Sequence, residues 1–533
     1  MTNKMANTGV WAVTAPHALA TQAGAEILDR GGNAIEAALA VSATLTVVYP
    51  HMNSLGGDAF WLIADGDGGL RGLDGAGPAG TAVTAEAYQS RGYARIPERG
   101  PLAANTVPGL LSTWEAAYIY SCTAWQGRQP WAGLLARALR FAADGFPASP
   151  SQRAMLAQSL PALQGSQRFL DHFLPGGEMP AVGSPFRQPA LARTLEEIQA
   201  HGAESFYRGA LAGRIARGLR AEGSLLTQDD LAAYRCRWVE PIGVPYSTGR
   251  LVNLPPPTQG VASLMVLAVM ERHGLAGMDH LGADYIHLAV EATKRVFRLR
   301  DRDVADPDFH PVPVTEWLSP AFLDRLAAGI DMRRAQPWPA GIGPGGTVWF
   351  GVMDARGRAV SVIQSLYFEF GSGVIAGDTG ILWQNRGCGF SLSQDHVNAL
   401  RPGKRPFHTL NPAMYLEQGG PALVYGTMGG EGQPQTQAAL VTRAHDFSLP
   451  LAEVLDSPRW LLGRTWGEAS VSLKLERRFD EGVYAELARR GHQVEWVAPY
   501  SSLMGHAGMI RRSGAGIEAM ADPRSDGAAL TGY

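Results

Sequence analysis

Apolar residues recur at helical spacing through most of the first two thirds of the chain. Residues 18–30 and 34–47 both show a three-to-four spacing, and Gly31 and Gly32 end the first segment before Asn33 caps the second. The same spacing is found between residues 130 and 300, in the segments 131–146, 190–202, 211–223 and 285–303. The pattern predicts a large helical portion in the first part of the chain.

The apolar period changes to two after residue 346. Residues 347–353 and 359–368 are separated by a turn at 354–357, which predicts a β-hairpin. Further strands are predicted at 59–64, after the glycine-rich turn 54–58, and at 422–425 and 508–511. Residues 335–346 are rich in proline and glycine, which predicts an exposed loop between a helical part and a strand-rich part.

Composition excludes several classes of function. Lys and Arg total 46 against 49 Asp and Glu, a net charge of −3, so the chain has no general electrostatic reason to bind nucleic acid or an anionic membrane. The three cysteines form no CxxC pair, which favours a reducing compartment. The most apolar stretch, 37–48, is too short to span a bilayer, and no secretory signal is visible at the amino terminus. We expect a cytoplasmic protein.

No cofactor or metal site is predicted. Residues 341–346 match GxGxxG, but a proline-rich loop precedes them and a strand follows, the wrong context for a dinucleotide fingerprint. His273, His280 and His287 recur every seven residues, and an acidic stretch spans 301–308 with arginines inside it. Neither group has convergent spacing, so both are expected to be solvated surface.

The start of the predicted hairpin offers nucleophilic chemistry. If the chain is cut between Gly346 and Thr347, the Thr347 hydroxyl becomes a nucleophile with its own base, the free α-amine, whose pKa is typically ~7.7–8.0. The other interpretation is an ordinary interdomain loop. Gly429 and Gly430 follow a predicted strand, and their successive N–H groups suit either an anion-binding nest or a tight turn.

Taken together, the motifs resemble the γ-glutamyltranspeptidase family of N-terminal-nucleophile hydrolases over nearly the whole chain. Trp114 and Thr347 match the family, as do the segments 31–34, 56–57, 107–109, 226–227, 230–234, 255–257, 370–373, 380–382, 404–406, 429–430 and 521–525. The resemblance implies an α+β fold, a four-layer αββα sandwich, made as a proenzyme that cleaves itself before Thr347.

The same resemblance implies two chains and a set of catalytic groups. The large chain is residues 1–346 and the small chain residues 347–533, together forming one intertwined catalytic unit, a heterodimer that can itself pair. Thr347 is the implied nucleophile, Ser365 the supporting hydroxyl eighteen positions later, and the Gly429 and Gly430 amides the implied oxyanion hole.

Departures from the family bear on the substrate. The family's carboxylate-binding Arg is absent from 73–78, and Gly389 replaces the ammonium-binding Asp. Losing these charge-assisted hydrogen bonds, each worth ~1.5–3 kcal/mol, disfavours γ-glutamyl substrates. The residues expected to line the pocket instead are Arg386, Tyr367, His408 and Thr409.

A guanidinium in a small pocket suits a small anionic amide. The chain looks most like the oxamate amidohydrolase branch, which implies hydrolysis of oxamate to oxalate and ammonia through an acyl-Thr347 intermediate, and a role in purine degradation. The alternatives are a glutathione hydrolase or γ-glutamyltransferase, a glutaryl-type acylase and, outside enzymes, an unprocessed pseudoenzyme. Arg386 has a second interpretation, as a salt bridge at the pocket rim.

Overall fold

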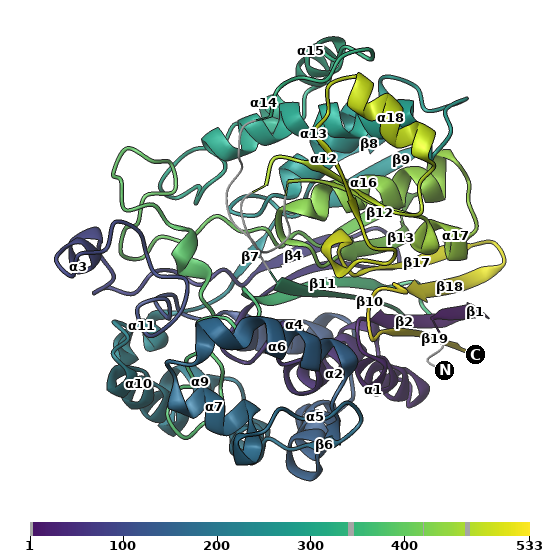
Figure 1. Cartoon of the computed structure of the whole chain (residues 1–533). Helices are drawn as coiled ribbons and strands as arrows, with labels where there is room; N and C mark the ends of the chain where they lie inside the picture. Colours follow the sequence, from purple (N-terminus) through teal and green to yellow (C-terminus); the bar gives the residue numbers. More distant parts are fainter. Residues whose placement is uncertain (1–3, 339–345, 419, 464–469) are drawn as a thin grey trace.

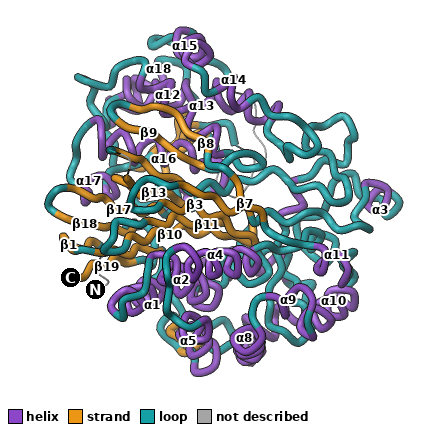
Figure 2. Tube along the Cα trace, turned by 180° about the vertical axis from the view of Figure 1, so that it is seen from behind, coloured by secondary structure: helices purple, strands orange, loops and turns teal. Residues whose placement is uncertain are grey.

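Four layers make up the molecule, which we describe from a computed structural model covering residues 4–338, 346–418, 420–463 and 470–533. Two seven-stranded antiparallel sheets lie face to face, and helices cover the outer face of each (Figures 1 and 2). The predicted α+β sandwich, with its large helical portion in the first part, is therefore confirmed.

Both sheets mix strands from before and after residue 346. Sheet A has the order β1 (Met5–Gly9), β18 (Gly516–Ala521), β17 (Ala507–Ser513), β13 (Gly420–Thr427), β12 (Ala413–Glu417), β9 (Gly249–Asn253), β8 (Ile242–Tyr246). Sheet B has the order β19 (Ala528–Gly532), β2 (Trp11–Ala15), β10 (Gly346–Met353), β11 (Ala359–Tyr367), β3 (Asp58–Ala64), β4 (Leu70–Asp74), β7 (Arg237–Val239). The two parts of the chain therefore share one fold.

The helices divide between the two outer faces and a peripheral group. Sheet B is covered by α1 (Ala18–Asp29), α2 (Ala34–Val48) and α4 (Leu110–Ala124), and sheet A by α12 (Gly260–Glu271), α16 (Gln433–Val441) and α17 (Leu451–Asp456). Against α12 and α16 packs α13 (Ala283–Asp303). The remaining helices are α3 (Ala85–Gln89), α5 (Trp131–Asp144), α6 (Pro150–Leu163), α7 (Gln167–Phe173), α8 (Pro189–His201), α9 (Glu204–Arg208), α10 (Ala210–Glu222), α11 (Gln228–Ala233), α14 (Val314–Trp317), α15 (Pro320–Ala328) and α18 (Glu481–Arg489).

Two small sheets complete the fold. They are β14 (Trp460–Leu462), β15 (Leu473–Glu476) and β16 (Val494–Val497), and the pair β5 (Phe146–Pro147) and β6 (Pro185–Phe186). In the part of the chain that the structure describes, no helix combines the length and the apolar character needed to cross a bilayer.

The space between the two sheets is apolar and closely packed. Trp349 on β10 fills it, and its ring needs two glycines on sheet A. A Cβ at Gly426 would lie 2.2 Å from the indole, and one at Gly508 would lie 2.4 Å from it. Since real Cβ atoms do not approach this closely, β10 can seat against β13 and β17 only because these positions are glycine.

The predicted helices and the predicted hairpin are confirmed. Asn33 forms a capping box with Glu36 at the start of α2, and β10 pairs antiparallel with β11. The expectation of mostly helical structure over 130–300 missed β7, β8 and β9, which are short; β8 contains glycine and proline, and β9 begins with glycine. Their strand conformation depends on pairing with distant segments rather than on local pattern.

Candidate active site

Three polar side chains form a row across neighbouring strands of sheet B. Ser365 on β11 pairs directly with Asp58, the first residue of β3, and Thr347 near the start of β10 donates from Oγ1 to Ser365 Oγ at 3.4 Å. Side chains two residues apart share a face of a strand, and Phe60 and Ile363 belong to the core between the sheets. The row therefore faces the inter-sheet space, where all three residues are buried.

The expected oxyanion turn follows the neighbouring strand of sheet A. β13 ends at Thr427, and Gly429 and Gly430 then adopt φ values of 139° and 50°, which side chains strongly disfavour. Because Trp349 contacts Gly426, the start of β10 and the end of β13 lie together. Successive backbone N–H groups in a turn can form an anion-binding concavity.

A buried hydrogen-bond bracket that the sequence did not predict holds this turn. Gln259 donates from Nε2 to the backbone oxygens of Thr409, at 2.8 Å, and Gly430, at 2.9 Å. Arg300 in turn donates to Gln259 Oε1 and to Glu431 Oε2, both at 2.9 Å. The bracket fixes the glycine turn relative to Thr409. The only sequence signal was an Arg within a helical segment predicted to be amphipathic.

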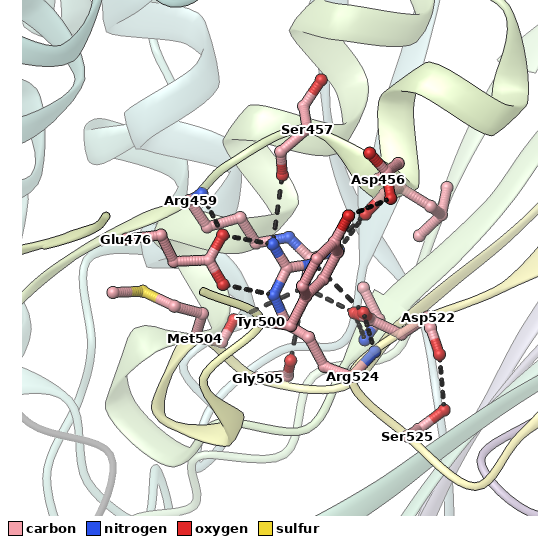
Figure 3. Close-up of polar contacts among 12 residues, drawn as sticks. Asp456, Ser457, Arg459, Glu476, Tyr500, Met504, Gly505, Asp522, Arg524 and Ser525 are labelled. Carbon is pink, nitrogen blue, oxygen red and sulfur yellow. Dashed lines mark hydrogen bonds and ion pairs between the residues drawn. The ribbon is translucent and has the colours of Figure 1, made fainter. Parts of the chain in front are cut away.

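Behind the turn lies a network of buried ion pairs, also unpredicted (Figure 3). Arg524 forms a fork with Glu476, at 2.6 and 2.5 Å, and Arg459 donates to Asp522 at 2.5 Å. Arg459 also donates to the backbone oxygen of Gly505 at 3.3 Å. The backbone oxygen of the next residue, His506, accepts a hydrogen bond from Met428 N at 2.9 Å. The network therefore supports the segment against which Met428 and Gly429 pack.

Arg386 and Thr409, two predicted pocket residues, meet in the structure. The Nη1 and Nη2 atoms of Arg386 lie 3.4 and 3.5 Å from Thr409 Oγ1, and its guanidinium carbon lies 3.8 Å from the centre of the Tyr367 ring. Burial lowers the pKa of Arg386 to about 10, while Tyr367 and Asp58 partly oppose that shift. Arg386 is thus a buried cation at neutral pH and not a rim residue.

Tyr367 adopts an unusual backbone conformation at this point. Its φ of 81° lies in the left-handed region, which costs a non-glycine residue roughly 1–3 kcal/mol. In this conformation the ring lies over the guanidinium of Arg386. Tyr367 also lines a partly open cavity of about 40 Å³, together with Arg300, Gly389, Phe407 and Glu431. A cavity of this size beside the glycine turn suits a small molecule.

His408, the fourth predicted pocket residue, contacts a carboxylate that the sequence analysis missed. Its Nε2 lies 2.9 Å from Asp58 Oδ2. Burial lowers the pKa of His408 well below its usual value, and Arg386 and Arg405 lower it further. Burial raises the pKa of Asp58 to about 7, against the hydrogen bonds from Gly109 N and Gln384 Nε2. The signal for Asp58 was a charged residue opening a wholly apolar strand.

The structure thus gathers the predicted residues around the ends of β10 and β11. Gly346 pairs with Tyr367 in the hairpin, whereas residues 339–345 of the predicted loop 335–346 lie outside the described residues. One expectation was wrong. His287 is not on the surface but fully buried, and within the acidic stretch Asp306 is buried against Arg405 at 2.5 Å. Both positions face the protein interior, so these polar groups are paired rather than solvated.

His287 lies close to two other potential metal ligands, Glu291 and His492. Lys294 Nζ, however, donates to Glu291 Oε1 at 2.7 Å, and His287 Nδ1 lies 2.8 Å from His492 Nε2. An ammonium group already neutralises the only carboxylate, so the donor set favours a structural hydrogen-bond network over a metal site.

Comparison with known proteins agrees with this geometry. The chain is 50% identical to the oxamate amidohydrolase proenzyme of Klebsiella pneumoniae over 97% of this chain and 98% of the relative. It is 43% identical to the glutathione hydrolase-like YwrD proenzyme of Bacillus subtilis, over 97% and 98% of the two chains. The crystal structure of cephalosporin acylase from Bacillus halodurans superposes with a TM-score of 0.91 at 34% identity, covering 100% of this chain and 98% of that one.

These similarities fix the class of protein. The relatives and structural neighbours are amidohydrolases, acylases and transpeptidases of the N-terminal-nucleophile type, so the chain is an enzyme of that broad class. A sequence profile described as gamma-glutamyltranspeptidase matches residues 20–532. The chain therefore belongs to the γ-glutamyltranspeptidase family.

Proposed function

We propose that this protein cleaves itself between Gly346 and Thr347 and then hydrolyses a small carboxylate-bearing amide, oxamate being the best candidate. The observation that carries the proposal is the placement of Thr347: a buried hydroxyl 3.4 Å from Ser365 Oγ, near the start of β10, whose Trp349 contacts Gly426 on the strand that leads into the glycine turn. After cleavage, the large and small chains remain together because both sheets contain strands of each.

The reaction needs no group beyond those of the chain. The Thr347 Oγ attacks the amide carbon while its proton passes to the α-amine, and the Gly429 and Gly430 amides stabilise the oxyanion. The C–N bond breaks as the amine returns the proton to departing ammonia. Water then attacks the Thr347 ester, and oxalate leaves.

Self-cleavage is tested on a denaturing gel. Mature protein is expected to give fragments of about 37 and 20 kDa, in proportion to residues 1–346 and 347–533 of the 56.9-kDa chain. Sequencing of the small fragment is expected to begin Thr-Val-Trp-Phe. Thr347→Ala should remain one inactive chain, whereas Thr347→Ser should still be cleaved. An active preparation of uncut chain would contradict the proposal and favour other chemistry.

Three observations support oxamate. Arg386 is a buried cation near Thr409 and Tyr367, the adjoining cavity is about 40 Å³, and a relative at 50% identity is named oxamate amidohydrolase proenzyme. Oxamate is a small amide joined directly to a carboxylate. Arg386 would neutralise that carboxylate while Thr347 attacks the neighbouring carbonyl.

Two other substrate classes compete within the family. The similarity to a cephalosporin acylase favours glutaryl-type amides, and the similarity to a glutathione hydrolase-like protein favours γ-glutamyl amides. Ammonia or amine release should be measured from oxamate, succinamate, glutaramate, a glutaryl amide and a γ-glutamyl anilide. The highest kcat/KM is expected for oxamate. A comparable value for the anilide would replace oxamate with a γ-glutamyl substrate. A cytoplasmic location and a role in purine degradation remain predictions.

A further inference from the structure

The pocket that we propose for an anion also contains a buried acid. Asp58, His408 and Arg386 are 0%, 1% and 2% exposed. Asp58 and His408 are joined at 2.9 Å, and the charge of Arg386 acts on both. With Asp58 ionised, the group of three is neutral, because one guanidinium balances one carboxylate.

Hydrogen bonding around these groups is asymmetric. Asp58 Oδ1 accepts from Gly109 N at 2.9 Å and Gln384 Nε2 at 3.0 Å, while Oδ2 faces His408. In contrast, His408 Nδ1 and Arg386 Nε are buried with no hydrogen-bond partner among the residues that the structure describes. The backbone of His408 is held by its N–H, which donates to Pro257 O, and by its C=O, which accepts from Gln259 N, and its ring packs edge-on against Phe60 at 4.6 Å.

Entry of a carboxylate upsets this balance. It would bring a second negative charge into a site that water does not screen, where an unpaired buried charge is strongly disfavoured. One added proton restores neutrality. Because Nε2 of His408 faces Asp58 in either protonation state, the added proton converts Nδ1 from an acceptor into a donor. That atom is one of the two without a partner, and a donor there can hydrogen-bond an anion.

We propose that binding of the substrate carboxylate is coupled to uptake of one proton by the Asp58–His408 pair, which then donates to the substrate from His408 Nδ1. The inference rests on the proposed function, since it assumes an anionic substrate beside Arg386. It adds Asp58 as a specificity-determining residue and gives the pair a role distinct from that of the nucleophile.

The other charged groups near the pair are already balanced or neutral. Arg405 bridges Asp74 and Asp306 at 2.6 and 2.5 Å. Burial raises the pKa values of Tyr207 and Tyr234 well above the ordinary value, so both phenols stay neutral. By comparison, burial raises the pKa of Asp58 only to about 7, which places proton uptake in the physiological range. The facing groups are thus Arg386, Arg405, Asp74, Asp306, Tyr207 and Tyr234.

The test is calorimetric titration of the mature enzyme with pyruvate, a monoanion of about the size of oxamate, and with the expected product oxalate, which carries two carboxylates, in two buffers of different ionisation enthalpy. The difference in heat gives the number of protons bound. For the single carboxylate of pyruvate near pH 8 we expect uptake of about one proton, and an affinity that weakens by up to about tenfold per pH unit above pH 7. Acetamide, a neutral amide, should take up none.

Variants show whether proton uptake depends on Asp58 and His408 or on another buried group. Asp58→Asn and His408→Gln should abolish proton uptake, and Asp58→Asn should make oxalate affinity independent of pH. Asp230→Asn, which alters a buried helix-capping carboxylate elsewhere, should leave uptake unchanged. Oxalate binding without proton uptake would overturn the coupling alone. If neither oxalate nor any anionic amide binds, both this inference and the proposed substrate class are wrong.

Discussion

Two buried arginines, Arg386 and Arg524, differ in what surrounds their guanidinium groups. Arg524 is enclosed by carboxylates, with a fork to Glu476 and a further bond to Asp522 at 3.2 Å (Figure 3). Arg386 has an aromatic ring and one hydroxyl at 3.4–3.5 Å, and its Nε lacks a partner within the described residues.

The pKa values follow the surroundings. Burial acts to lower both pKa values, but the charges of Asp522 and Glu476 more than compensate and raise the pKa of Arg524. At Arg386 burial prevails and lowers the pKa to about 10. A closed set of partners supports the fold, whereas an incompletely paired buried charge is available to a ligand.

The largest effect is expected from Arg524→Met. Removing one partner leaves Glu476 and Asp522 as buried carboxylates with less compensation, which should lower the free energy of unfolding by about 3–5 kcal/mol. Urea denaturation of the cleaved enzyme measures the change. Arg524→Lys, which keeps a charge but loses the fork, should fall in between. A loss below about 1 kcal/mol for the Met variant would show that the closed network is not a source of stability.

Asp58→Asn should show that the site around Arg386, unlike the network around Arg524, lowers the stability of the fold as pH rises. The pKa of Asp58 is about 7 in the folded protein and ~3.9 when unfolded, so between these values the unfolded chain binds fewer protons. Asp58 therefore lowers stability as pH rises from about 4 to 7, by up to about 4 kcal/mol. Asp58→Asn lacks this penalty and should gain on the wild type over the same window.

The pKa of Asp522 is shifted in the opposite direction to that of Asp58. Arg459 and Arg524 lower its pKa to about 2, against the effect of burial. Its contribution to stability is present above the unfolded pKa of ~3.9 and is lost as pH falls toward 2.

The Asp58 prediction is tested by measuring free energies of unfolding from pH 4 to 8, which should diverge between wild type and Asp58→Asn. Parallel curves would mean that Asp58 titrates normally.

Arg386→Met should affect substrate more than fold. Among the residues that the structure describes, the guanidinium has no ion pair at hydrogen-bond distance, and an apolar side chain of similar volume can replace a buried charge at little cost, so stability should change by less than about 1 kcal/mol. Loss of one charge-assisted contact, ~1.5–3 kcal/mol, should raise KM for oxamate by about 10- to 150-fold. Self-cleavage should be unaffected, and the KM of a neutral amide should be nearly constant. Unchanged kinetics with oxamate would remove Arg386 from the binding site.

The same contrast explains how far the sequence could predict the site. Thr347 and the glycine pair carry local signals, a change of period and a turn, and the resemblance to a family gave them roles. Ser365 was identified through that resemblance alone. Asp58 carries only its place at the start of an apolar strand, and Gln259 carries no local signal, because their importance arises from contacts with His408, Thr409 and Gly430 far along the chain. The missed strands β8 and β9 likewise depend on pairing with β12.

The smallest effect concerns the ring that covers Arg386. A cation–π contact is worth about 0.5–2 kcal/mol, so Tyr367→Leu should raise KM for oxamate by about 2- to 30-fold, while Tyr367→Phe, which keeps the ring, should change it less than about threefold. Tyr500→Leu is the matched control, since its half-exposed ring lies 5.4 Å from Arg524 and should leave KM unchanged. Equal effects of Leu and Phe at 367 would assign the role to the hydroxyl instead. In that case the Tyr367 ring does not stabilise the charge of Arg386 in the way that carboxylates stabilise the charge of Arg524. The two arginines then differ only in that Arg524 has ion-pair partners and Arg386 has none among the described residues.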